Sequence, residues 1–393
     1  MANRVAASDK LRLVVLGYMV RGPLGGLIWH HLQYVLGLAK LGHEVYFLED
    51  SDDYPSCYNP ENDSLGTDAS FGLNFVNQTL ERFGLEDRWS YFDAHTDRWF
   101  GLSVERVQDI CASTDILLNL SAVNPLRPWF ETVPRRVFVD TDPAFTQIRH
   151  LQDPAAHSLA AAHTSFFSFA ENIARPDCLV PKDGFPWQPT RQPIVLDAWP
   201  VTHGDRKAPW TTVMQWDSYT GREHAGKRFG MKSESFKPYF DLPRTCDQVF
   251  QLAVGSPSAP RDALTSQGWE VSNPLEVIRD PWDYQKFIQE SKGEWTVAKH
   301  GYVVSRSGWF SERSAAYLAS GRPVVTEDTG FPSWLPVGEG LLQFNSKASA
   351  ISAVETVESD YEFHCRSART IAEEYFDSGS VLSSLLERVL KGS

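Results

Sequence analysis

The side chains best suited to chemistry gather at the start of a predicted helix near position 311. Ser311 and Ser314 offer hydroxyl groups there, and Arg313 offers a guanidinium, beside the free N–H groups of the first helical turn. The positive end of a helix dipole and a guanidinium both favour phosphate oxygens. We therefore expect this helix start to bind a diphosphate. The predicted binding set also includes these neighbours: Arg306, Glu312, Glu327, Asp328, Thr329 and Gly330.

The elements that must hold this site can be predicted from the same stretch. Residues 312–319 contain good helix formers, and the hydroxyl of Ser311 can cap them by accepting a bond from a backbone N–H. Gly321 and Pro323 are residues that end a helix. Residues 323–326, Pro-Val-Val-Thr, are typical of a short buried strand. The loop after this strand is expected to accept hydrogen bonds from ligand hydroxyl groups on the same side as the helix start.

The run Ala319-Ser-Gly-Arg-Pro-Val-Val325, with Thr329-Gly330 after it, resembles the donor site of GT-B glycosyltransferases of the retaining, Gly-Gly-loop type. The resemblance implies an α/β fold with two Rossmann-like, doubly wound domains that face each other across a cleft. It also implies that the helix start holds the diphosphate of a nucleotide-sugar donor. Retaining members often carry two glutamates eight residues apart here, whereas this chain has Gly308 and Ala316. Glu312 is the acidic residue that could replace one of them, so retention and inversion both stay open.

The first fifty residues predict a doubly wound start. Residues 11–17 are typical of a buried strand, residues 27–41 have apolar residues at helical spacing, and residues 43–48 indicate a second strand. The glycine-rich loop after the first strand has two interpretations besides a tight turn. A dinucleotide site with Glu49 or Asp50 on a ribose requires G-x-G-x-x-G, which the loop lacks. The GT-B resemblance instead implies a close approach to the donor phosphates by two glycines, Gly25 and Gly26.

Four residues could deprotonate an acceptor hydroxyl. Asp140 and Asp142 follow a strand predicted at 137–139, and the carboxyl ends of parallel strands line the ligand crevice of open α/β sheets. The alternative is that these aspartates cap a turn. His30 and His31 lie on the predicted first helix, where the resemblance to inverting GT-B enzymes implies a base. Because adjacent residues point to different helix faces, they cannot both face the site, and a core position is the alternative.

Further positive groups precede the motif in the chain. Lys299 and His300 come just before it. Lys299 could neutralise the leaving diphosphate, and an ion pair within the protein is the alternative. The resemblance also implies a basic residue after the first strand of the second domain, which is predicted at 211–216. The candidates are Lys227, Arg228 and Lys232, with a solvated basic loop as the alternative.

Length and composition limit the domain organisation, the partners and the cellular location that we expect. The 393 residues suffice for an N-terminal acceptor-side domain at 1–200, a nucleotide-sugar-binding domain at 201–375 and a terminal helix at 376–393 that packs back on the first domain. The net charge of −13 argues against a nucleic-acid partner. Five scattered cysteines indicate reduced thiols. Residues 1–10 are polar and the run 11–16 is too short to span a membrane, so we expect a cytoplasmic protein.

These features predict a glycosyltransferase that moves a sugar from a nucleotide-sugar donor to a small-molecule or glycan acceptor. The eleven histidines show no metal-ligand spacing, and positive groups can stabilise the leaving diphosphate, so we expect no metal and no cofactor. Asp140-Thr-Asp142 matches the Asp-x-Asp metal-binding motif of another glycosyltransferase class. That class has a different fold, so the match is weak evidence for a metal. Two alternatives stay open. One is an epimerase or phosphorylase of the same fold, and the other is a catalytically inactive nucleotide-sugar-binding protein.

Overall fold

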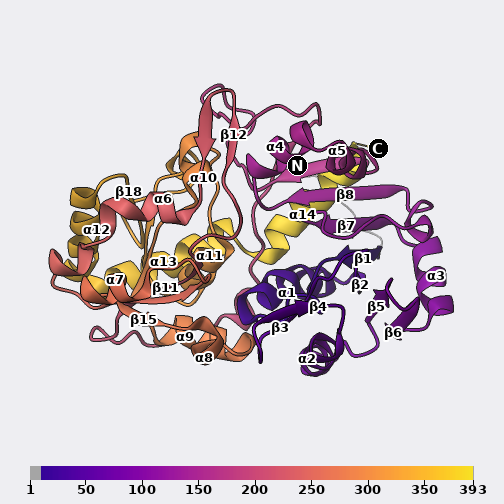
Figure 1. The fold of residues 1–393 in the computed structure, drawn as a ribbon, viewed down its shortest axis with the longest axis horizontal. Coiled ribbons are helices and arrows are strands. Elements are labelled where there is room, and N and C mark those ends of the chain that lie inside the picture. Colours follow the sequence, from indigo (N-terminus) through magenta and orange to yellow (C-terminus); the bar gives the residue numbers. More distant parts are fainter. Residues whose placement is uncertain (1–9, 393) are drawn as a thin grey trace, which may run out of the picture.

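The computed structural model describes residues 10–392 and divides them into two α/β domains that lie side by side (Figure 1). Residues 1–9, most of the polar N-terminal segment considered above, and residue 393 of the predicted terminal helix lie outside the described residues. One domain is built on an eight-stranded sheet and the other on a six-stranded sheet. These two Rossmann-like sheets confirm the predicted fold class. No helix in the described part of the chain is long and apolar enough to cross a bilayer.

The N-terminal sheet has eight strands: β1 (Arg12–Leu16), β2 (Glu44–Asp50), β5 (Trp89–Asp93), β6 (Arg98–Gly101), β7 (Ile116–Leu120), β8 (Arg135–Asp140), β9 (Ser165–Ser168) and β10 (Gln188–Pro189). Their order is β10-β9-β8-β7-β1-β2-β5-β6, and all pairs are parallel except β5 with β6. The central strands β1 and β7 are buried on both faces, which explains their continuous apolar sequences. The accompanying elements are α1 (Gly25–Lys40), α2 (Ser70–Glu81), α3 (Val104–Ala112), α4 (Phe145–Gln152), α5 (Pro154–Ala161) and the hairpin of β3 (Cys57–Asn59) and β4 (Ser64–Gly66).

The C-terminal sheet has six parallel strands: β11 (Trp210–Gln215), β14 (Phe250–Gly255), β15 (Glu270–Ser272), β16 (Gly293–Thr296), β17 (Val324–Glu327) and β18 (Leu341–Phe344). Their order is β15-β14-β11-β16-β17-β18. The helices are α6 (Lys232–Phe236), α7 (Arg261–Ser266), α8 (Pro274–Val277), α9 (Pro281–Glu290), α10 (His300–Ser305), α11 (Glu312–Ala319), α12 (Lys347–Ser359) and α13 (Tyr361–Tyr375). A hairpin of β12 (Arg222–His224) and β13 (Lys227–Phe229) follows β11 and reaches toward α4 (Figure 1). Short 3-10 turns complete the elements: η1 (Pro128–Phe130), η2 (Leu196–Ala198), η3 (Lys237–Tyr239), η4 (Leu242–Arg244) and η5 (Phe331–Ser333).

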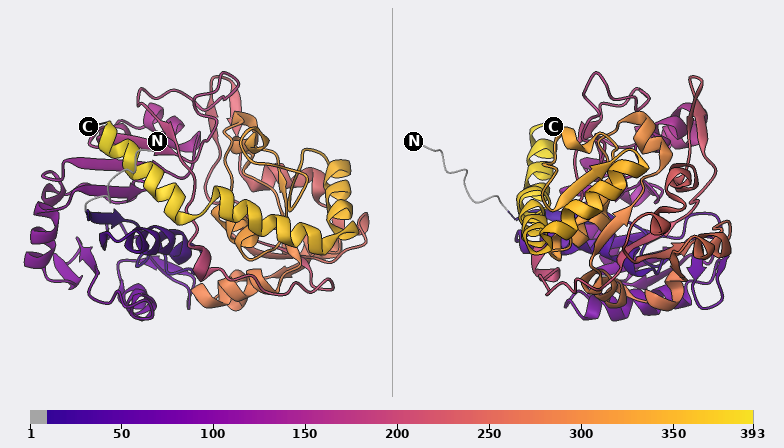
Figure 2. Two further views of the ribbon diagram at one scale, coloured as in Figure 1. Left: turned by 180° about the vertical axis from the view of Figure 1, so that it is seen from behind. Right: turned by 90° about the vertical axis from the view of Figure 1, so that its left-hand side faces the viewer.

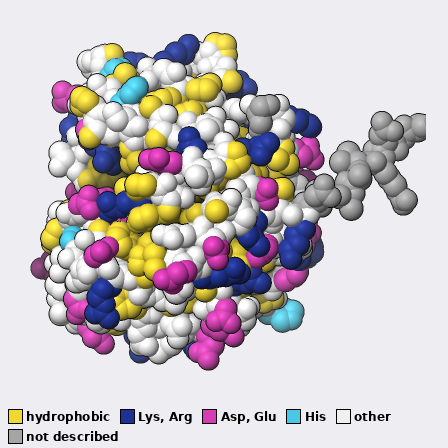
Figure 3. Space-filling view, turned by 90° about the vertical axis from the view of Figure 1, so that its right-hand side faces the viewer, with side chains coloured by type: hydrophobic (Ala, Val, Ile, Leu, Met, Phe, Trp, Pro, Cys, Tyr) yellow, Lys and Arg dark blue, Asp and Glu magenta, His cyan; other side chains and the backbone are white. Residues whose placement is uncertain are grey.

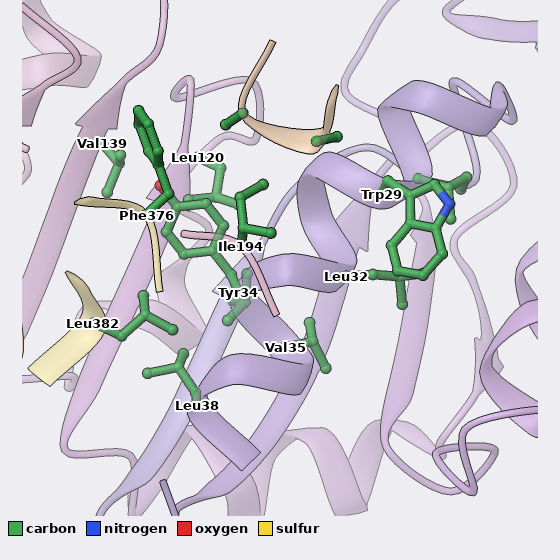
Figure 4. Close-up of a cluster of buried hydrophobic side chains, with 14 of the residues drawn as sticks. Trp29, Leu32, Tyr34, Val35, Leu38, Leu120, Val139, Ile194, Phe376 and Leu382 are labelled. Carbon is green, nitrogen blue, oxygen red and sulfur yellow. The ribbon is translucent and has the colours of Figure 1, made fainter. Parts of the chain in front are cut away.

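The end of the chain crosses back to the first domain. The last helix, α14 (Ser378–Lys391), leaves the second domain after α13 and lies along α1 (Figure 2). Gly37 makes this approach possible, because a Cβ there would lie 2.6 Å from a methyl carbon of Leu382. Leu382 and Leu38 then share a buried apolar cluster (Figure 4). Pairing of Ile194 with Asp377 joins the linker between the domains to the segment before α14.

The glycine pair at the start of α1 packs against the second domain. A Cβ on Gly25 would lie 2.4 Å from the backbone carbonyl oxygen of Asp280, and one on Gly26 would lie 3.0 Å from the ring of Tyr284. Trp29, one turn further along α1, donates its indole N–H to the carbonyl of Pro281 at 2.6 Å. The glycines therefore allow α1 to approach α9 closely. The close approach of Gly25 is to the backbone of Asp280 and that of Gly26 is to the ring of Tyr284, whereas the sequence interpretation assigned both to the donor phosphates.

We expect Gly25→Ala to lower the free energy of unfolding by about 1–3 kcal/mol, because the added methyl group overlaps backbone atoms that cannot rotate away. Gly66→Ala is the matched control, since nothing lies within 4 Å of a Cβ at that position. Thermal unfolding of the two variants measures the difference. An unchanged unfolding midpoint for Gly25→Ala would show that α9 can move away from the added methyl group without loss of stability.

Candidate active site

The predicted helix start is present and capped. Ser311 is the N-cap of α11, and its hydroxyl accepts a bond from the backbone N–H of Arg313 at 3.2 Å. Ser314, in the first turn, is buried. Glu312, the first helical residue, is half-buried, and its carboxylate has no hydrogen-bond or ion-pair partner among the described residues. The tip of α11 therefore combines free backbone N–H groups with a carboxylate that no protein group neutralises.

Arg313 is held against the second sheet and does not face an open diphosphate site. Its Nε donates to the carboxylate of Glu294 on β16, its Nη1 donates to the carbonyl of Val213 at 2.8 Å, and its Nη2 donates to the hydroxyl of Thr296 at 3.0 Å. Glu294 is fully buried. Burial is the largest single influence on the pKa of Arg313 and lowers it, but the charge and hydrogen bond of Glu294 together with the charges of Tyr284 and Glu312 raise the pKa overall. The assignment of Arg313 to the donor phosphates is therefore corrected to a buried ion pair.

A different cation is free in this region. Lys232 is the first residue of α6, and the N–H of the next residue, Ser233, bonds to the carbonyl of Trp216 directly after β11. Lys232 is only 9% exposed, and its ammonium has no hydrogen-bond or ion-pair partner in the described chain. Burial lowers its pKa well below the ordinary value, and the charge of Arg313 lowers it further. An unpartnered buried cation is costly, which points to an anionic ligand as the missing partner.

The other basic candidates near this position do not face the site. Arg228 pairs with the carboxylate of Glu234 at 2.9 Å, and Lys227 is exposed at the turn of the β12–β13 hairpin. His300 accepts a bond at Nδ1 from the backbone N–H of Gly230 at 3.3 Å, so it supports the end of the hairpin.

Asp140 is a structural carboxylate and is not available as a base. It is fully buried at the end of β8. It accepts bonds from the hydroxyls of Thr146 at 2.6 Å and Ser168 at 2.7 Å, from the amide of Gln147 at 3.0 Å and from the backbone N–H of Asp142 at 2.9 Å. Burial raises its pKa, and these bonds oppose that shift. With four donors in place and no exposed surface, it has no room for a substrate hydroxyl.

Asp142 links the two domains. Its carboxylate pairs with the ammonium of Lys299 at 2.9 Å and accepts bonds from the hydroxyls of Tyr219 and Tyr302. The Lys299 ammonium also lies 5.2 Å from the ring centre of Phe145. The structure thus shows the ion pair that was the alternative for Lys299, and it neutralises Asp142 within the protein.

The two adjacent histidines have different roles. His31 is fully buried, its Nδ1 donates to the carbonyl of Leu27 at 2.8 Å, and its Nε2 accepts from the backbone N–H of Tyr18 at 3.2 Å. Because both nitrogens are occupied, His31 is a core residue and its assignment as a base is corrected. His30 is 8% exposed and packs edge-on against the ring of Phe169, and its imidazole has no hydrogen bond to another described residue. Burial lowers the pKa of His30, so its imidazole is neutral at pH 7.

Several polar side chains of the two domains have no side-chain hydrogen bond or ion pair with another described residue near this junction. We call five of them the junction cluster: Tyr18, His30, Lys232, Tyr284 and Glu312. Burial sets the main pKa shift of the other four, and the negative charge of Glu312 acts on every one of them. None of their polar atoms is both fully shielded and unpartnered, so water or a ligand can bond to them. Sequence reasoning missed Tyr18 and Tyr284, because a single tyrosine beside an apolar run has no pattern that separates it from a core residue.

The loop after β17 binds mainly to the rest of the protein. Asp328 accepts a bond from the backbone N–H of Gly330 at 2.6 Å, and the hydroxyl of Thr329 donates to a backbone carbonyl of the loop before α11. The carbonyl of Gly330 accepts a bond from the side-chain amide of Asn172, in the first domain, at 2.9 Å. Arg306 has an exposed side chain 3.7 Å from a surface aspartate. These four predicted ligand contacts are therefore engaged in loop and domain contacts or lie on the surface.

Glu327 is the buried acid at the end of β17. One of its oxygens accepts the N–H of Ala298 at 3.1 Å, and burial raises its pKa from 4.5 to about 7. Because the folded protein holds the proton of Glu327 more tightly, the protonated carboxyl contributes to the free energy of unfolding. This contribution is complete below pH 4.5 and is lost as the pH rises through 7. Over this pH interval we expect the free energy of unfolding of the wild type to fall by up to about 3 kcal/mol. Glu327→Gln should not show this fall, because its side chain does not titrate. Denaturant unfolding at several pH values measures both proteins, and equal slopes would contradict the prediction.

Comparison with solved structures reproduces this architecture. An alpha-glucosyltransferase in complex with UDP-glucose and DNA containing an abasic site has a TM-score of 0.60 at 10% identity, over 97% of this chain and 100% of that one. The chain has the GT-B fold. Similar GT-B structures include sucrose-phosphate synthase from Thermosynechococcus elongatus (TM-score 0.56, 9% identity, 98% and 100% covered) and Anabaena HepE in complex with UDP and glucose (TM-score 0.55, 11% identity, 97% and 100% covered). No protein-family model and no curated protein matches the sequence.

The junction cluster contains residues from both Rossmann-like domains of the GT-B fold. Tyr18 and His30 belong to the first Rossmann-like domain, and Lys232, Tyr284 and Glu312 belong to the second. A molecule bound at the cluster would therefore contact both domains. At these low identities the likeness establishes the fold, so the chemistry must be argued from the cluster itself.

Proposed function

We propose that the protein is a glycosyltransferase that moves a sugar from a nucleotide-sugar donor to an acceptor hydroxyl. The observation that carries this proposal is Lys232, a buried cation without a protein partner in a GT-B fold. Its charge is coupled to Glu312 at the tip of α11, where the free N–H groups also favour an anion. Similar GT-B structures contain UDP or UDP-glucose, which supports a uridine nucleotide in the donor.

In the proposed reaction the bond from the anomeric carbon to the diphosphate oxygen breaks, and the oxygen keeps the electron pair. The acceptor oxygen bonds to the anomeric carbon and loses its proton. Lys232 and the N–H groups of α11 would stabilise the charge on the leaving diphosphate. We assign His30, whose neutral imidazole has no protein partner, as the base that takes the proton from the acceptor hydroxyl. Among residues 10–392 no three His, Cys, Asp or Glu side chains are placed to hold a metal ion, and we propose transfer without one.

A catalytically inactive nucleotide-sugar-binding protein is the second candidate. The paired glutamates of retaining relatives are absent, and the structure leaves no room for one of them. A Cβ on Gly308 would already lie 2.7 Å from the side-chain amide carbon of Asn172, and Ala316 is buried. Such a protein would bind the donor without releasing the nucleotide. An epimerase would instead convert the donor without an acceptor, and a phosphorylase would require inorganic phosphate.

A thermal-shift panel of UDP, GDP, dTDP and ADP sugars, followed by assay of free nucleotide, separates these functions. We expect a UDP-sugar to stabilise the protein and to release UDP, equally with and without EDTA. Absence of any shift would reject the donor site. Stabilisation without turnover would favour the inactive protein, and turnover that needs phosphate would favour the phosphorylase. Loss of activity in EDTA would reject the metal-free mechanism.

The proposal places the protein in the cytoplasm. None of its five cysteines, all within the described residues, forms a disulfide. Free thiols are the usual state in a reducing compartment.

A further inference from the structure

Lys232, the proposed donor cation, lies on a helix that is too short to be stable by itself. Helix α6 has five residues, and its N-cap residue, Met231, makes no side-chain capping bond within the described chain. A helix of this length needs outside contacts, because its first turn fixes several backbone dihedrals for one hydrogen bond. The side chains of Met231 and Phe236 are buried at its two ends, but apolar packing is non-directional. We therefore expect polar contacts to set the direction of α6.

Asp217, in the loop after β11, supplies a directional contact of this kind. Its carboxylate accepts a hydrogen bond from the hydroxyl of Ser233, the residue that follows Lys232. The backbone N–H of Ser233 also donates to the carbonyl of Trp216 at 3.2 Å. Ser233 is therefore bonded twice to the same short stretch of the loop. These two bonds fix the backbone next to Lys232, and with it the point from which the lysine side chain extends.

The loop after β14 in turn holds Asp217. The other carboxylate oxygen of Asp217 accepts a bond from the hydroxyl of Ser258 at 3.2 Å, and its backbone N–H donates to the hydroxyl of Ser256 at 3.2 Å. The hydroxyl of Ser256 lies 2.9 Å from the side-chain oxygen of Gln215, to which it can donate. Ser256 has a φ of 78°, in the left-handed region that residues other than glycine rarely adopt. Backbone strain of this kind persists where surrounding bonds enforce it, and it is concentrated at functional sites.

We propose that Asp217 is a positioning residue, which holds Lys232 where it meets the donor diphosphate. The proposal rests on the proposed glycosyltransferase function. The loop of Asp217 follows β11, and the order of the strands reverses between β11 and β16, which is where open α/β sheets bind ligands. A carboxylate would itself repel a phosphate, and both oxygens of Asp217 are engaged by serine hydroxyls. Its contribution to the donor site is therefore made through α6.

Replacement of Asp217 tests the proposal in the full-length protein, with the UDP-sugar that gives the largest thermal shift. Asp217→Ala is expected to lower kcat/KM for UDP release by about 10- to 100-fold, because a small displacement of a catalytic group has effects of this size. Ser233→Ala removes the donor of the same bond and should match it. Asp217→Asn should stay within about threefold of the wild type, because its amide oxygen can still accept that bond. Full activity of Asp217→Ala, or an Asp217→Asn as impaired as Asp217→Ala, would overturn the proposal.

The Lys232→Met background tests whether Asp217 acts through the lysine. Adding Asp217→Ala to Lys232→Met should change kcat/KM by less than about twofold, because the group that it positions is already absent. A second loss as large as that in the wild-type background would show that Asp217 acts independently of Lys232, and would overturn the proposal. Failure of the proposed function is a different result, since the wild type would then release no UDP from any UDP-sugar.

Ser103→Ala is the control for the loss of a serine hydroxyl alone. Ser103 caps α3 by accepting the backbone N–H of Arg106 at 3.3 Å. Helix α3 lies on the face of the first domain that is turned away from the second domain, and Figure 3 shows that positive and negative side chains are interspersed on this face. Loss of the cap should lower the unfolding midpoint and leave kcat/KM unchanged. An equal loss of activity in Ser103→Ala and Ser233→Ala would show that activity only follows stability, and would count against a positioning role.

Discussion

Lys232→Met is expected to lower kcat/KM for the nucleotide-sugar by about 100- to 1000-fold, the loss typical when one group that stabilises transition-state charge is removed. The same substitution is expected to raise the free energy of unfolding by about 1–3 kcal/mol, because an apolar side chain of similar length replaces a buried cation without a protein partner. Opposite changes in activity and stability mark a residue that is kept for a ligand and not for the fold. A UDP-release assay and urea unfolding without ligand measure the two quantities.

Lys227→Met is the matched control, because Lys227 is exposed on the neighbouring hairpin, and neither quantity should change. A pH series adds an independent readout. The donor diphosphate requires the protonated ammonium, and the pKa of Lys232 is lowered by burial. Donor affinity in the wild type should therefore fall as the pH rises through that pKa, and the methionine variant should lack this step. A destabilised Lys232→Met variant with full activity would show that the lysine is structural.

The fold could be predicted from the sequence because its signals are local and agree with one another. The apolar runs at β1 and β17 and the helix between Ser311 and Gly321 all have the predicted type. Each of these elements is specified by residues within a few positions of it, as helix caps and buried strands are. The order of the strands in each sheet then follows from the doubly wound topology.

The site was harder to predict because spacing along the chain does not tell which way a side chain points. Arg313 and Glu312 are neighbours at the start of α11, yet the guanidinium of Arg313 turns into the sheet and the carboxylate of Glu312 has no hydrogen-bond or ion-pair partner among the described residues. The glycines at positions 25 and 26 are another example. A missing Cβ indicates a close approach, but the sequence does not say whether a ligand or another helix makes that approach.

One part of the site did leave a signal that sequence reasoning passed over. Glu294 lies in the run Gly-Glu-Trp-Thr, which forms the fully buried strand β16 of the C-terminal sheet. A carboxylate in such a strand requires a cation, because an unpaired buried charge is very unfavourable. Arg313 is the partner that the fold supplies. The buried ammonium of Lys232 also requires a partner of opposite charge, but the described part of the protein supplies none. For this reason Lys232, and not Arg313, is assigned to the donor diphosphate.

Arg313→Met is therefore expected to lower the free energy of unfolding by about 3–5 kcal/mol, the cost of leaving a buried charge without its partner. Glu294 is fully buried, and its second oxygen already lacks a hydrogen bond. The double variant Arg313→Met, Glu294→Met should recover most of the loss, because no charge is then left unpaired.

Urea unfolding of the single and double variants measures these effects, and Arg228→Met is the control. Arg228 also pairs with a glutamate, but on the surface, so its removal should leave the unfolding midpoint unchanged. Donor affinity of folded Arg313→Met, measured by calorimetry with UDP, separates the two roles of the arginine. If Arg313 only pairs with Glu294, the Arg313→Met variant should be less stable but should still bind UDP, because Lys232 keeps its contacts with the diphosphate. An Arg313→Met protein that unfolds like the wild type and no longer binds UDP would instead make Arg313 the phosphate ligand.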